Sequence, residues 1–239
     1  MICVFGTEEQ EVKMLLKTAQ IFKVCKKDGI TIYETLLSGN SVIVAVIGYG
    51  KVNVGRGIGV VLGNYPITQI IGVGNCGSLI GNNAPPGTMA ISSNALQYDV
   101  DFSAIGCPVT VLPGTRCGTT CANSNMIKAA QNACRTNEYQ FTTGRFCTAD
   151  MFVSNTVKAK AIRCTFCGDF VDCEVGCIGE VANSSNIPFV CVKGISNTAD
   201  NNAAKMFDAN QCKANDAACR VAITLIENLM SETKQKTCQ

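Results

Sequence analysis

Polar side chains that could do chemistry follow directly on an apolar stretch of the chain. Residues 189–192 predict a buried strand that breaks at Gly194, and Ser196 and Asn197 come next. Ligands of open α/β sheets collect at the carboxyl ends of strands, because the loops there lie on a rigid edge. We therefore expect Asn197 to face a ligand. Glu11 is a second candidate, since it lies in the first turn of a predicted helix beside the end of the first strand.

The composition excludes several kinds of chemistry. The chain of 239 residues contains no histidine, so it lacks the base of Ser-His-Asp and Cys-His mechanisms and the commonest nitrogen ligand of zinc. A formal net charge of +2 gives no basic surface for nucleic acid or an anionic membrane. No apolar run approaches the roughly 20 residues of a membrane helix, and no secretory signal is recognisable. We expect neither a nucleic-acid partner nor a membrane partner.

The chain has 16 cysteines, a number that allows two interpretations. An even count is typical of a disulfide-stabilised protein from an extracellular or other oxidising compartment. We favour this interpretation because several cysteines fall in polar loops, where Cys117 with Cys121 and Cys212 with Cys219 are candidate local pairs. The alternative is a cytoplasmic protein whose cysteines are small buried hydrophobic residues.

Two motifs that could indicate a metal or a cofactor are rejected. Cys164-x2-Cys167 followed by Cys173-x3-Cys177 has metal-like spacing, but its second pair lies next to a predicted helix and not on a second loop. Residues 72–77 match the dinucleotide fingerprint G-x-G-x-x-G, yet a Pro-Pro break follows where a helix would have to begin. We expect no metal and no cofactor.

Alternating strands and helices predict one α/β domain over residues 1–239. The predicted strands are 2–5, 30–37, 41–47, 69–73, 88–91, 141–147 and 170–174, and the predicted helices are 8–22, one that opens at 48–59, 123–134, one through 158–162, one through 181, and 219–230. Residues 96–114 form an irregular excursion. Asp99 and Asp101 in that excursion are interpreted as loop carboxylates and not as an acid/base pair.

Five segments, taken together, carry a family resemblance: 6–12, 71–78, 148–153, 171–175 and 190–200. In this order they resemble the nucleoside phosphorylase/nucleosidase superfamily, with the closest likeness to methylthioadenosine/S-adenosylhomocysteine nucleosidases and then to purine nucleoside phosphorylases. The resemblance implies a three-layer α/β/α domain with a central mixed sheet and a pocket for a purine nucleoside or purine base. It also implies a homodimer or a higher homo-oligomer.

The resemblance assigns roles to residues of the pocket. Glu174 matches the carboxylate that binds the ribose 2′ and 3′ hydroxyls and favours an oxocarbenium-like transition state. Phe152 matches the aromatic that stacks on the purine, and Val153 supplies main-chain contacts. Glu11 matches the acid that activates the attacking water. Asn75, in the second of the five segments, is a further candidate for substrate binding.

Several positions depart from the nucleosidase pattern. Ser196 is a further candidate for substrate binding, and Asn197 follows it. Nucleosidases carry at the position of Asn197 an aspartic acid that donates a proton to purine N7. An amide has no proton to give. Lys193 replaces an arginine that orients the acid or the water, without its planar fork. Cys173 replaces a methionine before the ribose glutamate, and Glu8 stands where a methionine lies near the substrate 5′ end.

Hydrolysis is favoured over phosphorolysis by two further positions. Phosphorylases of this family hold phosphate with one arginine in the first loop and one that stands two residues before the Gly-x-Cys-Gly turn. This chain has an acidic first loop at residues 6–10 and Gly72 at the second position. Neither can clamp a dianion. Ile105 stands where the neighbouring subunit lends an aromatic residue.

Three functions stay open on this basis. The first is a purine nucleoside hydrolase with weakened or altered activity. Asn197 would then favour inosine or guanosine, since trimeric purine nucleoside phosphorylases use an asparagine to recognise 6-oxopurines. The second is a protein that binds purines or nucleosides with little turnover. The third is an inactive, secreted storage or structural protein of the same fold, as bark storage proteins similar to this family are.

Overall fold

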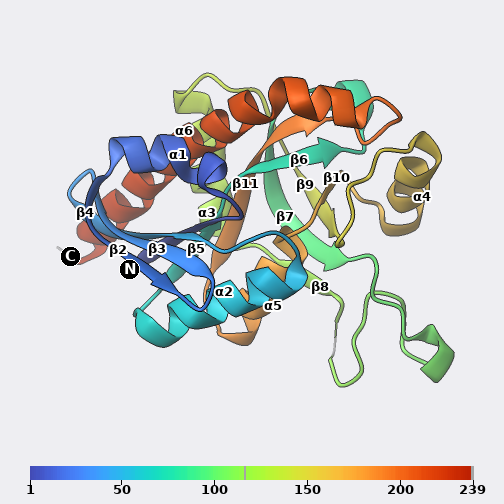
Figure 1. The fold of residues 1–239 in the computed structure, drawn as a ribbon, viewed down its shortest axis with the longest axis horizontal. Helices are drawn as coiled ribbons and strands as arrows, with labels where there is room; N and C mark the ends of the chain where they lie inside the picture. The colour runs from blue at the N-terminus through green and yellow to red at the C-terminus, as the bar shows by residue number, and fades with distance from the viewer. Residues whose placement is uncertain (116, 238–239) are drawn as a thin grey trace.

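Within residues 1–115 and 117–237, which the computed structural model describes, an eleven-stranded mixed sheet forms the middle of the structure (Figure 1). The strands are β1 (Ile2–Gly6), β2 (Gln20–Lys27), β3 (Ile30–Leu37), β4 (Asn40–Val46), β5 (Gln69–Gly72), β6 (Asn75–Ser78), β7 (Met89–Gln97), β8 (Thr119–Cys121), β9 (Phe141–Thr148), β10 (Phe170–Asp172) and β11 (Phe189–Asn197). Their order is β2-β3-β4-β1-β5-β11-β6-β10-β9-β7-β8. An additional pairing of β11 with β7 closes five of the strands into a ring.

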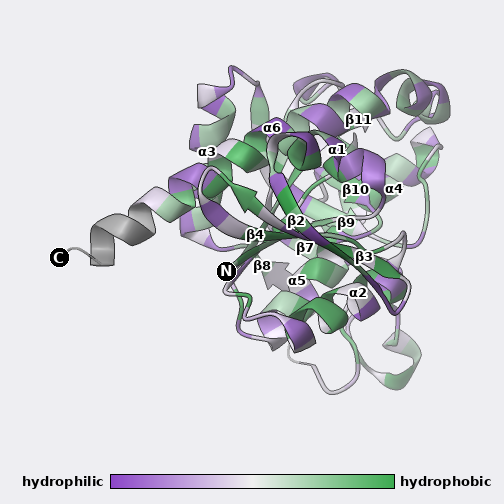
Figure 2. Cartoon of the chain, turned by 60° about the vertical axis from the view of Figure 1, so that its left-hand side comes forward, coloured by the Kyte–Doolittle hydropathy of each residue, from purple (hydrophilic) through white to green (hydrophobic). Residues whose placement is uncertain are grey.

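Helices cover both faces of the sheet. They are α1 (Glu9–Thr18), α2 (Lys51–Asn64), α3 (Ser124–Thr136), α4 (Thr156–Phe166), α5 (Val175–Ser184) and α6 (Ala203–Thr237). Figure 2 shows α1, α3 and α6 on one side of the sheet and α2 and α5 on the other, each side with its own apolar cluster. α4 covers a smaller cluster of its own. The predicted three-layer α/β/α fold with a central mixed sheet is confirmed.

The side chains of β1 show how the sequence specifies the layers. Ile2 and Val4 pack into the cluster of α1, α3 and α6, while Cys3 and Phe5 pack into the cluster of α2 and α5. Successive side chains of a strand point to opposite faces, so a strand covered on both sides must be apolar throughout. Each fully buried side chain of this size stabilises the fold by roughly 1.5–3 kcal/mol.

Strand β11 joins the two parts of the sheet and carries three of the candidate residues. It runs parallel to β5 at Val190, next to Ile71, and then pairs with β6 and, antiparallel, with β7. All nine residues of Phe189–Asn197 are buried. Because the strand is held on both sides, Lys193, Ser196 and Asn197 have fixed positions at its carboxyl end.

The predicted break at Gly194 is wrong, because β11 continues to Asn197. A Cβ atom at Gly194 would lie 2.3 Å from the carbonyl oxygen of Ala214. Glycine is therefore required there by the close approach of α6, and not by a turn.

Two element boundaries also differ from the prediction. The helix predicted to reach residue 22 ends at Thr18, and Gln20–Lys27 forms the edge strand β2, which is exposed along nearly its whole length. Exposure removes the alternating pattern by which a strand is recognised. α6 begins at Ala203, well before the predicted residue 219. The sequence did not indicate its first turns because they are polar and mostly exposed.

The expected disulfides are corrected by the structure, since all cysteines among its described residues are free. Cys212 and Cys219 both belong to α6, about 10 Å apart along a helix that rises about 1.5 Å per residue, and a disulfide spans at most about 7 Å between Cα atoms. Cys117 and Cys121 are exposed and unpaired. Seven others are buried and unpaired: Cys3, Cys76, Cys134, Cys147, Cys177, Cys191 and Cys219.

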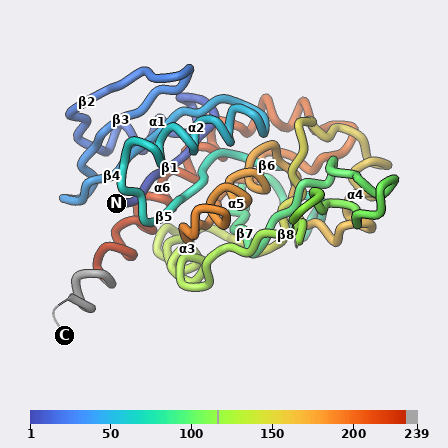
Figure 3. The backbone as a smooth tube through the Cα atoms, turned by 90° about the horizontal axis from the view of Figure 1, so that it is seen from below, coloured from blue at the N-terminus to red at the C-terminus, as the bar shows by residue number. Residues whose placement is uncertain are grey.

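The β2–β3 hairpin and the loop that follows β7 lie at opposite ends of the molecule in both Figure 1 and Figure 3. Among the residues that the structure describes, no helix has the length and apolar character needed to cross a membrane.

Candidate active site

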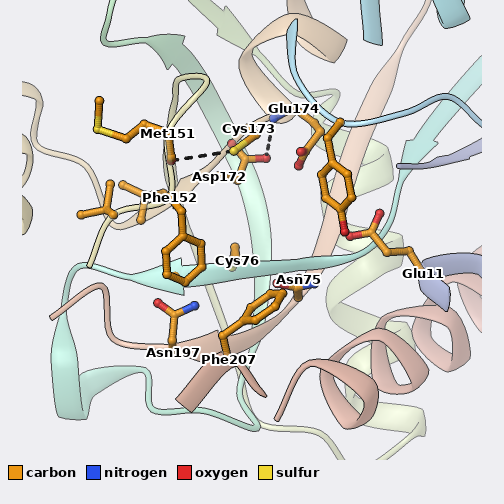
Figure 4. A pocket seen from close by; sticks show the side chains of 14 residues that line it. Glu11, Asn75, Cys76, Met151, Phe152, Asp172, Cys173, Glu174, Asn197 and Phe207 are labelled. Carbon is orange, nitrogen blue, oxygen red and sulfur yellow. Dashed lines mark hydrogen bonds between the residues drawn. The ribbon is translucent and has the colours of Figure 1, made fainter. Parts of the chain in front are cut away.

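A cavity of about 230 Å³ opens where β9, β10 and β11 end. Side chains from seven separate parts of the chain reach it (Figure 4). They are Glu11, Tyr49, Asn75, Cys76, Gly77, Met151, Phe152, Val153, Val171, Asp172, Cys173, Glu174, Asn197 and Phe207. Figure 4 places Glu11 and Glu174 toward one side of the cavity and Phe152 and Asn197 toward the other. The cavity therefore has an acidic part and an aromatic and amide part.

Glu11 is buried in the first turn of α1, with only 2% of its surface exposed. Its Oε2 accepts hydrogen bonds from the backbone N–H and the hydroxyl of Thr7, at 2.7 and 2.8 Å. Burial raises the pKa of its carboxyl, although the nearby Lys193 lowers that pKa. Thr7 thus does not cap the helix but fixes the carboxylate, and one Glu11 oxygen is left for a ligand or a water.

The turn between β5 and β6 is shaped to admit Glu11. Gly74 has φ +127°, and a Cβ atom there would lie 2.4 Å from Oε1 of Glu11. Only glycine allows this backbone conformation and this approach at once. Gly74 therefore makes room for an acid, and β6 follows it where a dinucleotide fingerprint would require a helix.

Lys193 holds the second acid in place. Its Nζ donates to Oε2 of Glu174 at 2.6 Å and lies 3.5 Å from Oδ2 of Asp172, and all three side chains are buried. Asp172 in turn accepts from the Thr148 hydroxyl at 2.6 Å and from the backbone N–H of Val175 at 2.8 Å. The carboxylate of Asp172 therefore anchors the start of α5, and with it Glu174.

The carboxyls around Lys193 outnumber its single positive charge. The pKa of Glu174 is raised to about 7, chiefly by burial and in addition by the charge of Asp172, although Lys193 lowers it. Burial alone would lower the pKa of Lys193, but the carboxylates of Glu174, Asp172 and Glu11 outweigh burial and raise it. One ammonium group therefore faces three carboxyls, and the cavity is suited to a ligand that develops positive charge.

Two phenylalanines form the apolar part of the cavity. The rings of Phe152 and Phe207 meet edge to face, with centroids 5.5 Å apart and an angle of 78° between their planes. Phe152 follows β9 and is 49% exposed, and Val153 beside it is buried. Phe207 comes from the start of α6. A planar ring can lie against this wall.

Asn197 lies at the end of β11 and is 3% exposed. Its Nδ2 donates to Oγ of Ser196 at 3.0 Å, and its Oδ1 accepts from the backbone N–H of Ala199 at 2.9 Å. A Cβ atom at Gly77 would lie 2.9 Å from the same Oδ1, so Gly77 leaves room for the carboxamide. The second N–H of Nδ2 is free to meet a ligand.

Most of the residues predicted for the site lie at this cavity. Its wall contains Glu11, Asn75, Phe152, Val153, Cys173, Glu174 and Asn197. Lys193 and Ser196 are fully buried behind the wall and contact it through Glu174 and Asn197. Glu8 is not among the lining residues; it stands at the start of α1 without capping the helix by its side chain.

Two prominent lining residues were missed from the sequence. Phe207 lies in the polar first half of α6, which was taken for a loop. Tyr49 lies between Gly48 and Gly50, whose φ angles are 88° and 87°, and these two turns hold its ring at the cavity. Burial and the charge of Glu11 raise the pKa of Tyr49. The glycine pair was visible in the sequence and was the available signal.

Among the described residues, no group of three or more histidine, cysteine, aspartate or glutamate side chains could hold a metal ion. Asp99 accepts a hydrogen bond from Lys51 at 2.7 Å, and Asp101 accepts from the backbone N–H of Ser103 at 2.9 Å. Both aspartates are therefore loop carboxylates, as predicted.

Comparison with known proteins agrees with this architecture. The chain is 28% identical over 242 residues to the 5′-methylthioadenosine/S-adenosylhomocysteine nucleosidase of Buchnera aphidicola, over 98% of this chain and 92% of the relative. The structure is similar to that of the Neisseria meningitidis nucleosidase in complex with methylthio-immucillin-A, with a TM-score of 0.90, 25% identity, and coverage of 94% of this chain and 97% of the other.

The fold extends to proteins with a different name. The futalosine hydrolase of Helicobacter pylori has a TM-score of 0.90 at 19% identity, over 95% of this chain and 97% of the other. The family model of the phosphorylase superfamily matches residues 1–227. The chain therefore belongs to the phosphorylase superfamily.

Proposed function

We propose that this protein hydrolyses the N-glycosidic bond of a purine nucleoside, slowly, because no acid protonates the leaving base. One observation carries the proposal: two buried carboxyls with raised pKa, Glu11 and Glu174, share a cavity with an aromatic wall. The nucleosidases to which the chain is similar support the same reaction class.

The ribose would lie on the acidic side. An ionised Glu174 can accept from two vicinal hydroxyls at once, and Lys193 keeps its carboxylate in position. Cleavage of the glycosidic bond develops positive charge on the ribose ring, which the surplus of carboxylates stabilises more in the transition state than in the ground state. Glu11, with one oxygen free of Thr7, would orient and deprotonate the attacking water.

The purine would lie against Phe152 and Phe207, with its imidazole edge at Asn197. The free N–H of the carboxamide can donate a hydrogen bond to N7 but cannot transfer a proton. A positioned general acid contributes about 10²–10⁴-fold to a rate, so turnover should be slow by that order. A 6-oxo group beside N7 is a second acceptor for this donor, whereas a 6-amino group is not. Inosine and guanosine should therefore be preferred to adenosine.

Water is a better nucleophile for this cavity than phosphate. Neither arginine nor lysine is among the residues that line it. Lys193 lies behind the wall and is already engaged by Glu174 and Asp172. A phosphate dianion would thus meet carboxylates without a cation to hold it.

The test is release of free base from inosine, guanosine, adenosine and methylthioadenosine, with and without phosphate. We expect base to appear without phosphate, fastest from the 6-oxopurine nucleosides, and Glu11→Gln and Glu174→Gln to abolish its release. Absence of base from every nucleoside contradicts hydrolysis. A strict requirement for phosphate would identify a phosphorylase instead.

Purine binding without turnover is the second candidate, and the amide at Asn197 favours it. Calorimetry would then show binding that Glu174→Ala or Phe152→Ala abolishes, with no base released. A protein that binds no purine or nucleoside at millimolar concentration would fit the third alternative, a storage or structural role.

The working unit is proposed to be a homodimer that covers the open side of the cavity. A second hollow of about 430 Å³ adjoins the cavity and shares Tyr49, Phe152 and Cys173 with it. In the wall of this hollow, Val52 is 82% exposed, Tyr49 52% and Phe152 49%. Exposed apolar side chains that gather beside a cavity are typical of an interface. Sedimentation should show a dimer that Val52→Asp dissociates, and a monomeric wild type at micromolar concentration would contradict it.

A further inference from the structure

A chain of hydrogen bonds leads from the interior of α6 to the cavity. The Nδ2 of Asn75 donates to Oδ1 of Asn215 at 3.0 Å, and the Ser196 hydroxyl lies 3.2 Å from Oδ1 of Asn75. The Nδ2 of Asn197 then donates to Oγ of Ser196 at 3.0 Å. Asn215 is fully buried, while Asn75 and Asn197 reach the cavity wall. The four side chains come from three elements, α6, β6 and β11.

Each bond in this chain fixes the direction of the next. Oδ1 of Asn215 is an acceptor, so Asn75 presents its amide nitrogen to Asn215 and its oxygen to Ser196. The Ser196 proton is directed to Asn75 or to the carbonyl of Cys76, which is also at 3.2 Å. The oxygen of Ser196 can therefore only accept from position 197, and an amide nitrogen satisfies that requirement.

Asn215 carries a cost that packing does not explain. Its Nδ2 is buried and has no hydrogen-bond partner among the described residues. A buried donor without a partner lowers stability, so native proteins rarely keep one. An apolar side chain of the same shape would avoid this cost but would leave Asn75 without an acceptor. The position of Asn215 at the far end of the chain is thus best explained by what it does to Asn75.

The orientation of Asn197 follows from both of its neighbours. Its Oδ1 is held by the N–H of Ala199 and its Nδ2 by Ser196. The carboxamide cannot turn over without losing both bonds, because Ala199 offers only a donor and Ser196 only an acceptor. The remaining N–H of Nδ2 faces the cavity, where it requires an acceptor atom.

We propose that Asn215 and Asn75 are positioning residues that fix Asn197 as a hydrogen-bond donor, so that the site selects a base with an acceptor ring nitrogen at that point. This inference rests on the proposed function, which places the base at Asn197. It identifies the ligand as a heteroaromatic base that is recognised by the lone pair of a ring nitrogen. It also assigns part of this selectivity to Asn215 of α6, which does not itself contact the base.

The test compares hypoxanthine with 7-deazahypoxanthine, which differ only in a nitrogen or a C–H at position 7. Calorimetry on the wild type should show hypoxanthine bound roughly tenfold more tightly, the size of one hydrogen bond. Asn215→Leu should reduce that ratio of affinities to about two, because it weakens the binding of hypoxanthine and not that of 7-deazahypoxanthine. Asn215→Asp keeps an acceptor for Asn75 and should retain the wild-type ratio.

The control is Asn137→Leu, the same chemical change at a residue that bonds α6 through Thr224 but has no link to the cavity. It should lower the melting temperature without altering the ratio. If Asn215→Leu weakens the binding of both bases equally, or leaves the ratio of their affinities unchanged, the positioning role is wrong. If Asn215→Leu does not fold, Asn75→Leu must abolish the ratio in its place. Failure of the wild type to bind either base would overturn the proposed function together with this inference.

Discussion

The ionisation of Glu174 is set by its neighbours. Burial takes its carboxyl out of water and raises the pKa to about 7, against the opposing effect of Lys193. Asp172 contacts the same lysine, and its charge is a second cause of this raised pKa. Between pH 4.5 and about 7, the folded protein therefore keeps a proton on Glu174 that the unfolded chain has already released.

This difference predicts how stability depends on pH. A state that binds more protons is favoured at low pH, so the contribution of Glu174 is fully present below about pH 4.5 and is lost as the pH rises to about 7. The melting temperature should fall over this range, and less steeply in Glu174→Gln. The melting temperature of Glu174→Gln should still fall somewhat with pH, because the pKa of Glu11 is also raised. Thermal unfolding at half-unit pH intervals measures both slopes.

Glu34→Gln is the matched control for this experiment. Hydrogen bonds from Lys23 and Tyr65 lower the pKa of Glu34, so its effect on stability lies on the acid side of pH 4.5. Its slope between pH 5 and about 7 should equal that of the wild type. An unchanged slope in Glu174→Gln would show that this carboxyl does not titrate near neutral pH.

Asn197→Asp is the substitution that returns a proton donor to the cavity. A protonated carboxyl can donate to purine N7, so release of base should rise by about 10²–10⁴-fold, the contribution of a positioned general acid. Adenosine should gain more than inosine, because the second carboxyl oxygen accepts from a 6-amino group. Base release at pH 5–8 measures the gain, with Asn197→Leu as the control that has no donor. Equal rates in the wild type and Asn197→Asp would mean that protonation of the base does not limit turnover.

Individual site residues were predictable to the extent that they stand in short segments at strand ends. Glu11, Glu174 and Asn197 each lie at the end of a strand or within five residues after it, and the structure brings all three to one cavity. Phe207 does not follow a strand, and its place depends on how α6 packs across the sheet. Asn215 was equally invisible, because only the folded chain shows that its side chain points at Asn75.

At the scale of elements, buried strands and amphipathic helices were predictable and exposed ones were not. The core strand β1 and the helix α3 were found within a few residues of their bounds. β2 was missed because an edge strand that is exposed on both sides has no period of burial. The early part of α6 was missed for a similar reason, since a polar helical turn resembles a loop when only its composition is known.

The turn between β5 and β6 provides a prediction at this scale. Gly74→Ala would place a methyl group 2.4 Å from Oε1 of Glu11, so the acid must move away from the cavity. Gly87→Ala is the control, because Gly87 also has a positive φ, +95°, but nothing lies within 4 Å of its Cβ position. Both variants should lose about 1–3 kcal/mol of stability through backbone strain. Only Gly74→Ala should lose release of base, and equal activity in the two variants would contradict a role for Glu11.

For the whole molecule, the sequence predicted the layers correctly and the cysteines incorrectly. The family resemblance implied the three layers, and the apolar runs of the central strands agree with helices on both sides. Cysteine count carries no comparable constraint, because a buried thiol and half of a disulfide are equally compatible with an apolar environment. The distinction depends on Cα distances, which only the fold supplies.

Chemical titration of thiols tests this point. The structure contains free thiols at all fifteen cysteines of its described residues, so denatured, unreduced protein should react with at least fifteen equivalents of Ellman's reagent. Native protein should react first at the five exposed positions, Cys117, Cys121, Cys164, Cys167 and Cys212. Burial raises the pKa of Cys134 and Cys191 to about 12, so these thiols should react only on unfolding.

A reducing agent should leave the melting temperature unchanged. Fewer thiols in the unreduced protein, with a lower melting temperature on reduction, would restore the disulfides and the oxidising compartment that they imply.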